Sequence, residues 1–123
     1  MIGYAMAGTK DLKKAAEFFD NVLKVVGAKR LMEEDTFIVW GKSMEETSFS
    51  ICLPYNGEEA EPGNGTMISF IAESKDQVDA IYNAAMENGA SCEGKPGMRW
   101  ETFYAGYFRD LDGNKFNAFY PHA

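Results

Sequence analysis

Residues 3–23 read GYAMAGTKDLKKAAEFFDNVL, a short alternating segment that leads directly into a pattern with helical spacing. Thr9 is a candidate N-cap for the helix, and Asp11 lies in its first turn, where the helix dipole favours an anion. Gly27 follows the last apolar residue of the pattern and is suited to ending the helix. The stretch therefore predicts a strand over 4–7 followed by an amphipathic helix.

The same order of elements occurs again in the second half of the chain. Lys10-Asp11 and Lys75-Asp76 open the two helical patterns, and a Gly-Ala pair follows each helix. Ser74 and Gln77 have the spacing of a capping box at the start of the second helix. One strand precedes each helix, and three segments of β type follow it. The predicted strands are 4–7, 30–33, 36–40 and 48–53 in the first half, and 67–72, 91–93, 102–108 and 115–120 in the second.

This repetition predicts one α+β domain over residues 1–123, built from two tandem βαβββ modules. The first module covers about 1–54, a Gly-, Glu- and Pro-rich linker covers 55–65, and the second module covers about 66–123. A single unit of about 55 residues would leave one sheet face bare, so the two must pack or curl together. We expect a pseudo-twofold axis and a mixed sheet that curves around one cleft, the alternative being a chance similarity of two helical units.

Composition excludes several classes of protein. The net charge of −7 argues against a nucleic-acid surface and against an anionic membrane surface, whereas a cationic small molecule would be favoured. The alternative, that the excess of acidic residues only keeps the protein soluble and says nothing about a ligand, stays open. No apolar run reaches the length of a membrane span, and the N-terminus lacks the pattern of a signal peptide. Cys52 and Cys92 lack CxxC spacing, so we expect free thiols and a cytoplasmic protein.

Two stretches together resemble a known superfamily. They are residues 3–23 and the closing stretch 104–121, YAGYFRDLDGNKFNAFYP. Within the duplicated pattern, they resemble the glyoxalase/bleomycin-resistance/dioxygenase proteins, also called the vicinal-oxygen-chelate superfamily, over nearly the whole chain. The turn 110–114 suits a tight hairpin with a positive φ in any fold, so we interpret it as structural. The resemblance implies two curved half-sheets that enclose a small-molecule site, commonly in a homodimer.

The resemblance also implies where metal ligands stand in metal-dependent members. Carried onto this chain, the four positions are Tyr4, Ser50, Met67 and Asn117. Divalent ions prefer carboxylates and imidazoles, and this set contains neither. The only histidine, His122, lies in the C-terminal tail. We therefore expect no metal and no other cofactor.

The alternation of side chains along the strands extends this set to one face of the sheet. The opposite face is nearly all apolar, as packing against helices requires, and this supports the register. Arg99 and Trp100 are added as a pair that could clamp a ligand carboxylate, although an exposed Arg beside a half-buried Trp is the simpler interpretation. Whether Trp40, Tyr104 and Tyr107 line the cleft or the core is left open. The candidate ligand-binding residues are Tyr4, Met6, Ser50, Cys52, Met67, Ser69, Arg99, Trp100, Lys115, Asn117 and Phe119, unless these side chains simply fill the core between the sheets.

Three functions remain compatible with these residues. The first is a metal-free protein that binds a small, partly aromatic molecule that can be cationic, as the resemblance to bleomycin-resistance proteins implies. The second is an enzyme of glyoxalase-lyase or dioxygenase type, whose chemistry needs a metal that this chain lacks the residues to hold. A metal-free version using Tyr4 or Lys115 as acid or base is a further possibility. The third is a dimeric scaffold without a ligand.

Overall fold

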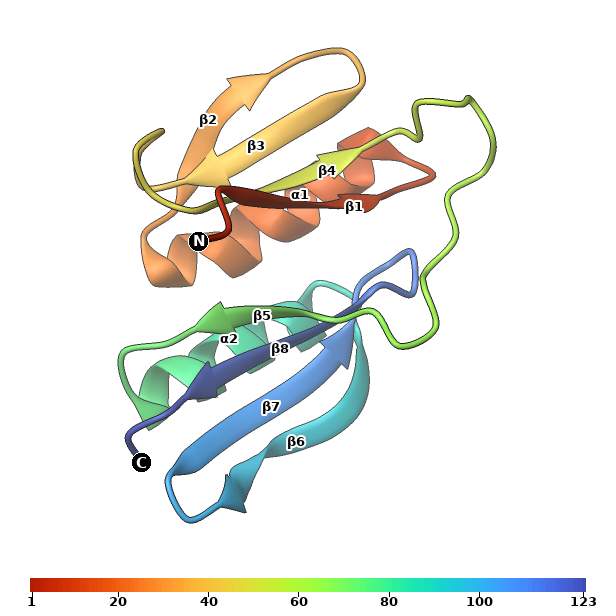
Figure 1. Cartoon of the computed structure of the whole chain (residues 1–123). Coiled ribbons are helices and arrows are strands. Elements are labelled where there is room, and N and C mark those ends of the chain that lie inside the picture. Colours follow the sequence, from red (N-terminus) through yellow and green to blue (C-terminus); the bar gives the residue numbers. More distant parts are fainter.

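The computed structural model describes all 123 residues and contains two βαβββ units in succession (Figure 1). The first unit comprises β1 (Tyr4–Gly8), α1 (Leu12–Leu23) with the short 3-10 turn η1 (Lys24–Val26), β2 (Lys29–Glu33), β3 (Phe37–Gly41) and β4 (Ser48–Cys52). The second comprises β5 (Ile68–Ile71), α2 (Lys75–Glu87), β6 (Ser91–Trp100), β7 (Phe103–Arg109) and β8 (Lys115–Tyr120). The predicted fold class of two tandem α+β modules is confirmed.

Each unit forms its own four-stranded mixed sheet, and the two sheets have the same topology. The strand orders are β1-β4-β3-β2 and β5-β8-β7-β6, with the first pair of each parallel and the others antiparallel. In Figure 1 the edge strands β1 and β5 are turned toward each other, and α1 and α2 both lie behind the sheets. We call the two sheet surfaces turned away from the helices the open face.

The start of α1 differs from the sequence prediction. Asp11, not Thr9, is the N-cap, and its Oδ1 accepts a hydrogen bond from the Lys14 backbone N–H at 3.1 Å. The Thr9 hydroxyl instead lies 2.6 Å from Oδ2 of Asp112 in the distant β7–β8 turn. The Thr9 hydroxyl thus bonds a distant residue, where the sequence had predicted that it would cap the helix. The residues next to Thr9 give no indication of this distant partner. At the other end, Gly27 has a φ of 80°, as predicted for a residue that closes the helix.

The second helix begins as its sequence predicts. The Ser74 hydroxyl accepts a hydrogen bond from the Gln77 backbone N–H at 3.0 Å, and the Gln77 side chain accepts one from the Glu73 N–H at 2.8 Å. These bonds satisfy donors that the helix itself cannot pair. Neither helix is long and apolar enough to cross a membrane.

Strand β6 is longer than the predicted strand 91–93 and extends through 94–97 to Trp100. It runs over ten residues and pairs with β7 with shifts in register between Cys92 and Gly94 and between Gly94 and Gly97. Pro96 is compatible with a strand here because β6 is an edge strand, where one side of the backbone needs no ladder partner. The extension carries Arg99 and Trp100 onto the sheet.

Aromatic side chains join the two units into one core on the helix side. Phe19 of α1 lies 5.4 Å from Phe116 of β8, and Phe49 of β4 lies 5.4 Å from Phe70 of β5, measured between ring centroids. Trp40 is also buried in this core, with 1% of its surface exposed. Edge-to-face and offset aromatic pairs of this type add about 0.5–1.5 kcal/mol each beyond the area that they bury.

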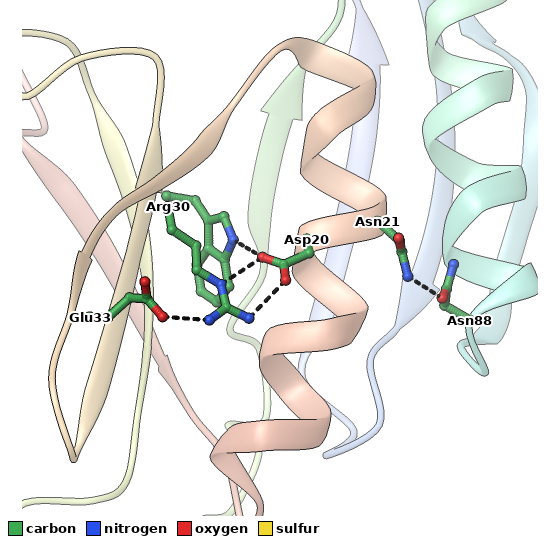
Figure 2. A network of polar contacts seen from close by, with 6 residues as sticks. Asp20, Asn21, Arg30, Glu33 and Asn88 are labelled. Carbon is green, nitrogen blue, oxygen red and sulfur yellow. Dashed lines mark hydrogen bonds and ion pairs between the residues drawn. The ribbon is translucent and has the colours of Figure 1, made fainter.

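Polar contacts also join the units. The Asn114 side chain donates to the Gly8 carbonyl at 2.8 Å, so the β7–β8 turn is held against the end of β1. Between the helices, the Asn21 amide donates to the Asn88 side chain at 2.8 Å (Figure 2). These contacts set the relative position of the two sheets, and with it the shape of the open face.

Candidate functional site

Strand β8 shows how the open face is built. Phe116 and Ala118 are fully buried in the core on the helix side. Lys115, Asn117 and Phe119 alternate with them and so project onto the open face, because successive side chains of a strand point to opposite sides. The same alternation holds on β1, where Tyr4 and Met6 are exposed, and on β5, where Ser69 and Ile71 are exposed while Ile68 and Phe70 pack on the core.

Of the four positions at which the resemblance implies metal ligands, Tyr4, Ser50 and Asn117 lie on β1, β4 and β8, and Met67 directly precedes β5. Tyr4 is 63% and Met67 40% exposed, whereas Ser50 and Asn117 are buried. The Ser50 hydroxyl donates to the Ile38 carbonyl at 3.0 Å, so its proton already has a partner. No three side chains of His, Cys, Asp or Glu come together anywhere in the chain. The residues present therefore do not fit a divalent metal.

Asn117 is the unusual residue among these four. Its side chain is buried, and its Oδ1 has no hydrogen-bond partner in the chain. Buried polar atoms in folded proteins are nearly always paired, because an unmade hydrogen bond costs about 1–3 kcal/mol. An unpaired carboxamide oxygen beneath the open face marks a place where an outside group can complete the bonding.

Two cations lie against one aromatic ring beside Asn117. Tyr107 of β7 is the register partner of Asn117, so its ring lies on the open face. The Arg99 guanidinium carbon is 5.2 Å and the Lys115 Nζ 5.8 Å from the centroid of this ring. Arg99 is held there by a hydrogen bond from its Nη2 to the Lys95 carbonyl at 2.7 Å. The arrangement attracts negative charge.

Farther along the same strands, three aromatic rings form a row. Phe103 stacks on Phe119 with centroids 5.3 Å apart, and Trp100 meets Phe103 edge-on at 5.0 Å. Trp100 remains 70% exposed, and Ile71, the register partner of Phe119, is 65% exposed. Such a row offers flat apolar surface to a ligand ring.

A hollow of about 160 Å³ opens where β1, the linker and β8 meet. Its lining includes Met6 and Lys115 from the predicted set, together with Glu61, Thr66 and Asn114. It therefore continues the open face between the two sheets. The other predicted residues lie on the sheets on either side of it.

The structure also assigns the aromatic residues that the sequence left open. Trp40 belongs to the core, and the Tyr104 hydroxyl donates to Asp79 of α2 at 2.7 Å on the helix side, a hydrogen bond that raises the tyrosine pKa. Tyr107 lies on the open face. Sequence reasoning missed Phe103 and left Tyr107 undecided, although alternation along 103, 105 and 107 would have placed both on one side.

Cys52 does not add nucleophilic chemistry to the site. Its thiol is free and partly buried on the strand that carries Ser50. Burial raises the pKa of the Cys52 thiol, which disfavours the reactive thiolate. We therefore treat Cys52 as a packing residue at the border of the open face.

Comparisons with known proteins agree with this geometry. A family model described as the glyoxalase/bleomycin resistance protein/dioxygenase superfamily matches residues 1–118. The chain is similar to a crystal structure of a glyoxalase/bleomycin resistance protein from Albidiferax ferrireducens T118, with 34% identity, a TM-score of 0.90 and 98% of each chain covered.

More distant solved structures share the fold. A hypothetical protein from S. aureus is 23% identical with a TM-score of 0.73, covering 95% of this chain and 91% of that one. A glyoxalase/bleomycin resistance protein/dioxygenase family enzyme from Burkholderia phytofirmans PsJN is 16% identical with a TM-score of 0.75, covering 97% of each chain. No curated protein matches the sequence.

Proposed function

Since this chain belongs to the glyoxalase/bleomycin resistance protein/dioxygenase superfamily, we propose that it binds a small, partly aromatic molecule on its open face without a metal. The observation that carries the proposal is the make-up of that face. Neutral side chains occupy the four metal-ligand positions, and one of them, Asn117, is a buried amide with an unpaired oxygen. An exposed aromatic row lies farther along the strands that carry Asn117 and Tyr107. A concave apolar surface with a few convergent polar groups is the usual form of a small-molecule site.

The aromatic row supports the partly aromatic ligand. Trp100 exposes most of its surface next to Phe103 and Phe119, so a ligand ring can extend the stack without rearrangement of the sheet. Each added aromatic pair contributes about 0.5–1.5 kcal/mol beyond the buried area. The expectation of a cationic ligand came from the net charge of −7, whereas the charged groups against the Tyr107 ring are Arg99 and Lys115, and the nearby Arg109 is ion-paired with Glu93.

Binding is tested by screening small aromatic compounds for a rise in melting temperature and mapping the hits by NMR chemical-shift changes. We expect hits to perturb the aromatic row, and the paired substitution Trp100→Ala with Phe119→Ala to weaken them at least tenfold. Met98→Ala is the matched control, because Met98 pairs with Tyr104, whose side chain lies on the helix side. Hits that map only to the helix side would contradict the proposal.

The absence of a metal is tested by rebuilding the donor set. Tyr4→His, Ser50→Glu, Met67→His and Asn117→Glu together restore imidazoles and carboxylates, so we expect zinc or nickel binding by calorimetry that the parent chain lacks. Because Ser50 and Asn117 are buried, Tyr4→His with Met67→His alone, both at exposed positions, serves as the variant that keeps the fold. Stoichiometric metal on the parent chain, lost in Asn117→Ala, would overturn the proposal.

An enzyme of lyase or dioxygenase type is the second candidate within the superfamily. Such chemistry uses a metal to hold paired substrate oxygens, and the donors for it are missing. The only histidine, His122, lies edge-on to the Tyr120 ring at 5.8 Å near the C-terminus, away from the open face. Binding without turnover is therefore the function that these residues support best.

We also propose that the chain forms a homodimer. Tyr4, Met6, Ile71 and Trp100 are each exposed by 45% or more on the open face, and exposed large apolar side chains of this kind are typical of an interface between subunits. A second copy packed beside this surface would cover part of it and deepen the hollow. Sedimentation that shows only monomer at micromolar concentration would contradict this, and a dimer that binds no ligand would favour the scaffold function.

Charge and cysteine chemistry bear on the setting of the protein. Cys52 and Cys92 are both free, as expected in the reducing cytoplasm where we propose that the protein works. The net charge of −7 makes nucleic acid an unsuitable partner, since phosphate binding needs an excess of clustered cations. Cell fractionation that recovers the protein outside the cytoplasm would overturn this placement.

A further inference from the structure

We infer that the ligand of the open face carries an oxyanion, a carboxylate or a phosphate monoester, held between Arg99 and Lys115 above the Tyr107 ring. This inference rests on the proposed binding function and names the chemical class of the ligand. The negative charge of this ligand is opposite to the positive charge that the net charge of the chain suggests.

The pairing of the arginines singles out Arg99. The chain has three arginines, and Arg30 and Arg109 each form an ion pair, with Asp20 and Glu33 in the first case and Glu93 in the second. Arg99 has no carboxylate partner and is bonded only to a backbone carbonyl. In a protein with more acidic than basic residues, an arginine without an acidic partner has its charge available to a ligand.

Lys115 brings a second cation to the same ring. Its Nζ also lacks an acidic partner within ion-pair distance, although Glu61 lines the same hollow. Arg99 on β6 and Lys115 on β8 flank Tyr107 on the intervening strand β7, so two positive charges lie against one aromatic ring. An oxyanion above this ring is attracted by both charges and can accept hydrogen bonds from both side chains, with the planar guanidinium able to bind two oxygens at once.

Asn117 supplies an independent indication of a ligand. It lies opposite Tyr107 in the sheet, is 99% buried and keeps an unpaired amide oxygen. Rotation of the carboxamide by half a turn exchanges this oxygen for the NH2 group, which donates to an oxyanion. The site thus offers a guanidinium and an ammonium against the Tyr107 ring, and an amide at the register position opposite that ring.

The distance to the aromatic row defines the rest of the ligand. Asn117 and Phe119 are two residues apart on β8, which is about 7 Å along a strand. An acid group joined to an aromatic ring by two or three atoms therefore places its charge over Tyr107 and its ring against Phe119 and Trp100. The chemical class is an arylalkyl carboxylate or phosphate.

Four probes of nearly equal shape test the charge requirement on the full chain. They are hydrocinnamate, phenethyl phosphate, the neutral hydrocinnamide and the cationic phenethylamine, each titrated by calorimetry and mapped by NMR. We expect one or both anions to bind at least tenfold more tightly than the amide, and the amine to bind most weakly. The affinity of the two anions should fall as salt is added, because the charges on this face are exposed to solvent.

Substitutions identify the groups responsible. We expect Arg99→Gln and Lys115→Gln each to reduce anion binding at least tenfold, and to reduce the binding of neutral hydrocinnamide by a clearly smaller factor. Lys75→Gln is the matched control, since Lys75 Nζ lies 5.7 Å from the Tyr104 ring on the helix side of the same sheet. All three positions bear long cationic side chains, so the three substitutions are comparable. The melting temperature of each variant verifies that its fold is intact.

The outcomes separate this inference from the function on which it rests. Equal binding of the acid and the amide, or full anion affinity in both Gln variants, overturns the oxyanion site while leaving binding on the open face in place. If none of the four probes binds the open face, the proposed function fails together with the inference. A preference between hydrocinnamate and phenethyl phosphate decides which oxyanion the site takes.

Discussion

Replacement of Asp20 by alanine should destabilise the fold by about 1–4 kcal/mol, through the network in Figure 2. The Asp20 carboxylate accepts hydrogen bonds from Arg30 Nε at 2.9 Å, from Arg30 Nη2 at 2.7 Å and from the Trp40 indole N–H at 2.9 Å. These bonds connect α1 to strands β2 and β3. The indole is the critical partner because Trp40 is only 1% exposed.

The two kinds of bond contribute differently. Removal of the carboxylate leaves the buried indole N–H without an acceptor, which costs about 1–3 kcal/mol. The ion pair is half-exposed, with 31% of the Arg30 and 41% of the Asp20 side chain accessible, so its own contribution is at most about 1 kcal/mol. Arg30 also keeps its second partner, Glu33, at 2.6 Å.

Asp20→Asn is the matched control for this prediction. The carboxamide keeps an oxygen for Trp40 but loses the charge that Arg30 binds, so we expect a loss of only about 1 kcal/mol. Urea titrations followed by far-UV circular dichroism give both values, and the m-value should stay constant. Equal losses in the alanine and asparagine variants would show that the indole hydrogen bond is not the main contribution, and the reasoning would be wrong.

The pH dependence of the same site has a defined sign. Desolvation raises the Asp20 pKa, but hydrogen bonds from Arg30 and Trp40 and the charge of Arg30 outweigh it, and the net pKa lies below the ordinary 3.8. Because the folded pKa is the lower one, the stabilisation is fully present above pH 4 and is lost as the pH falls through the folded value. The difference between the parent chain and Asp20→Asn should therefore shrink in strong acid.

Two further predictions concern the second module. Burial raises the pKa of Asp110 to about 6, so between pH 4 and 6 the folded protein keeps a proton on this carboxyl that the unfolded chain has lost. The free energy of unfolding therefore falls by up to about 3 kcal/mol as the pH rises from 4 to 6. Asp110→Asn keeps an oxygen for the Asp112 and Asn114 N–H groups and should remove this slope in urea titrations, so parallel pH profiles of the two proteins would contradict the assignment. Phe116→Ala should cost about 3–5 kcal/mol, because the ring is fully buried among aromatic rings from both modules, and a loss below 1 kcal/mol would mean that the modules do not share a core.

Local chemistry in the chain was enough to predict its elements and their repetition. The helical spacing after Thr9, the capping pair of Ser74 and Gln77 and the turn at 110–114 act over a few residues, so their signals lie within short stretches. The alternation along β8 likewise assigned Lys115 and Phe119 to one side of the sheet. These parts of the prediction agree with the structure because neighbouring residues determine them.

Contacts between distant residues could not be read in this way. Thr9 bonds Asp112 across more than a hundred residues, which displaces it from the N-cap, and Trp40 enters the core because Asp20 accepts its indole proton. The grouping of Arg99, Tyr107 and Lys115 depends on the bulged register of β6 against β7, and no spacing in the sequence encodes that register. The sequence offered Arg99 beside Trp100 as a clamp for a carboxylate, but only the tertiary structure showed that Tyr107 and Lys115 lie beside Arg99, because the sheet brings these side chains from three strands together.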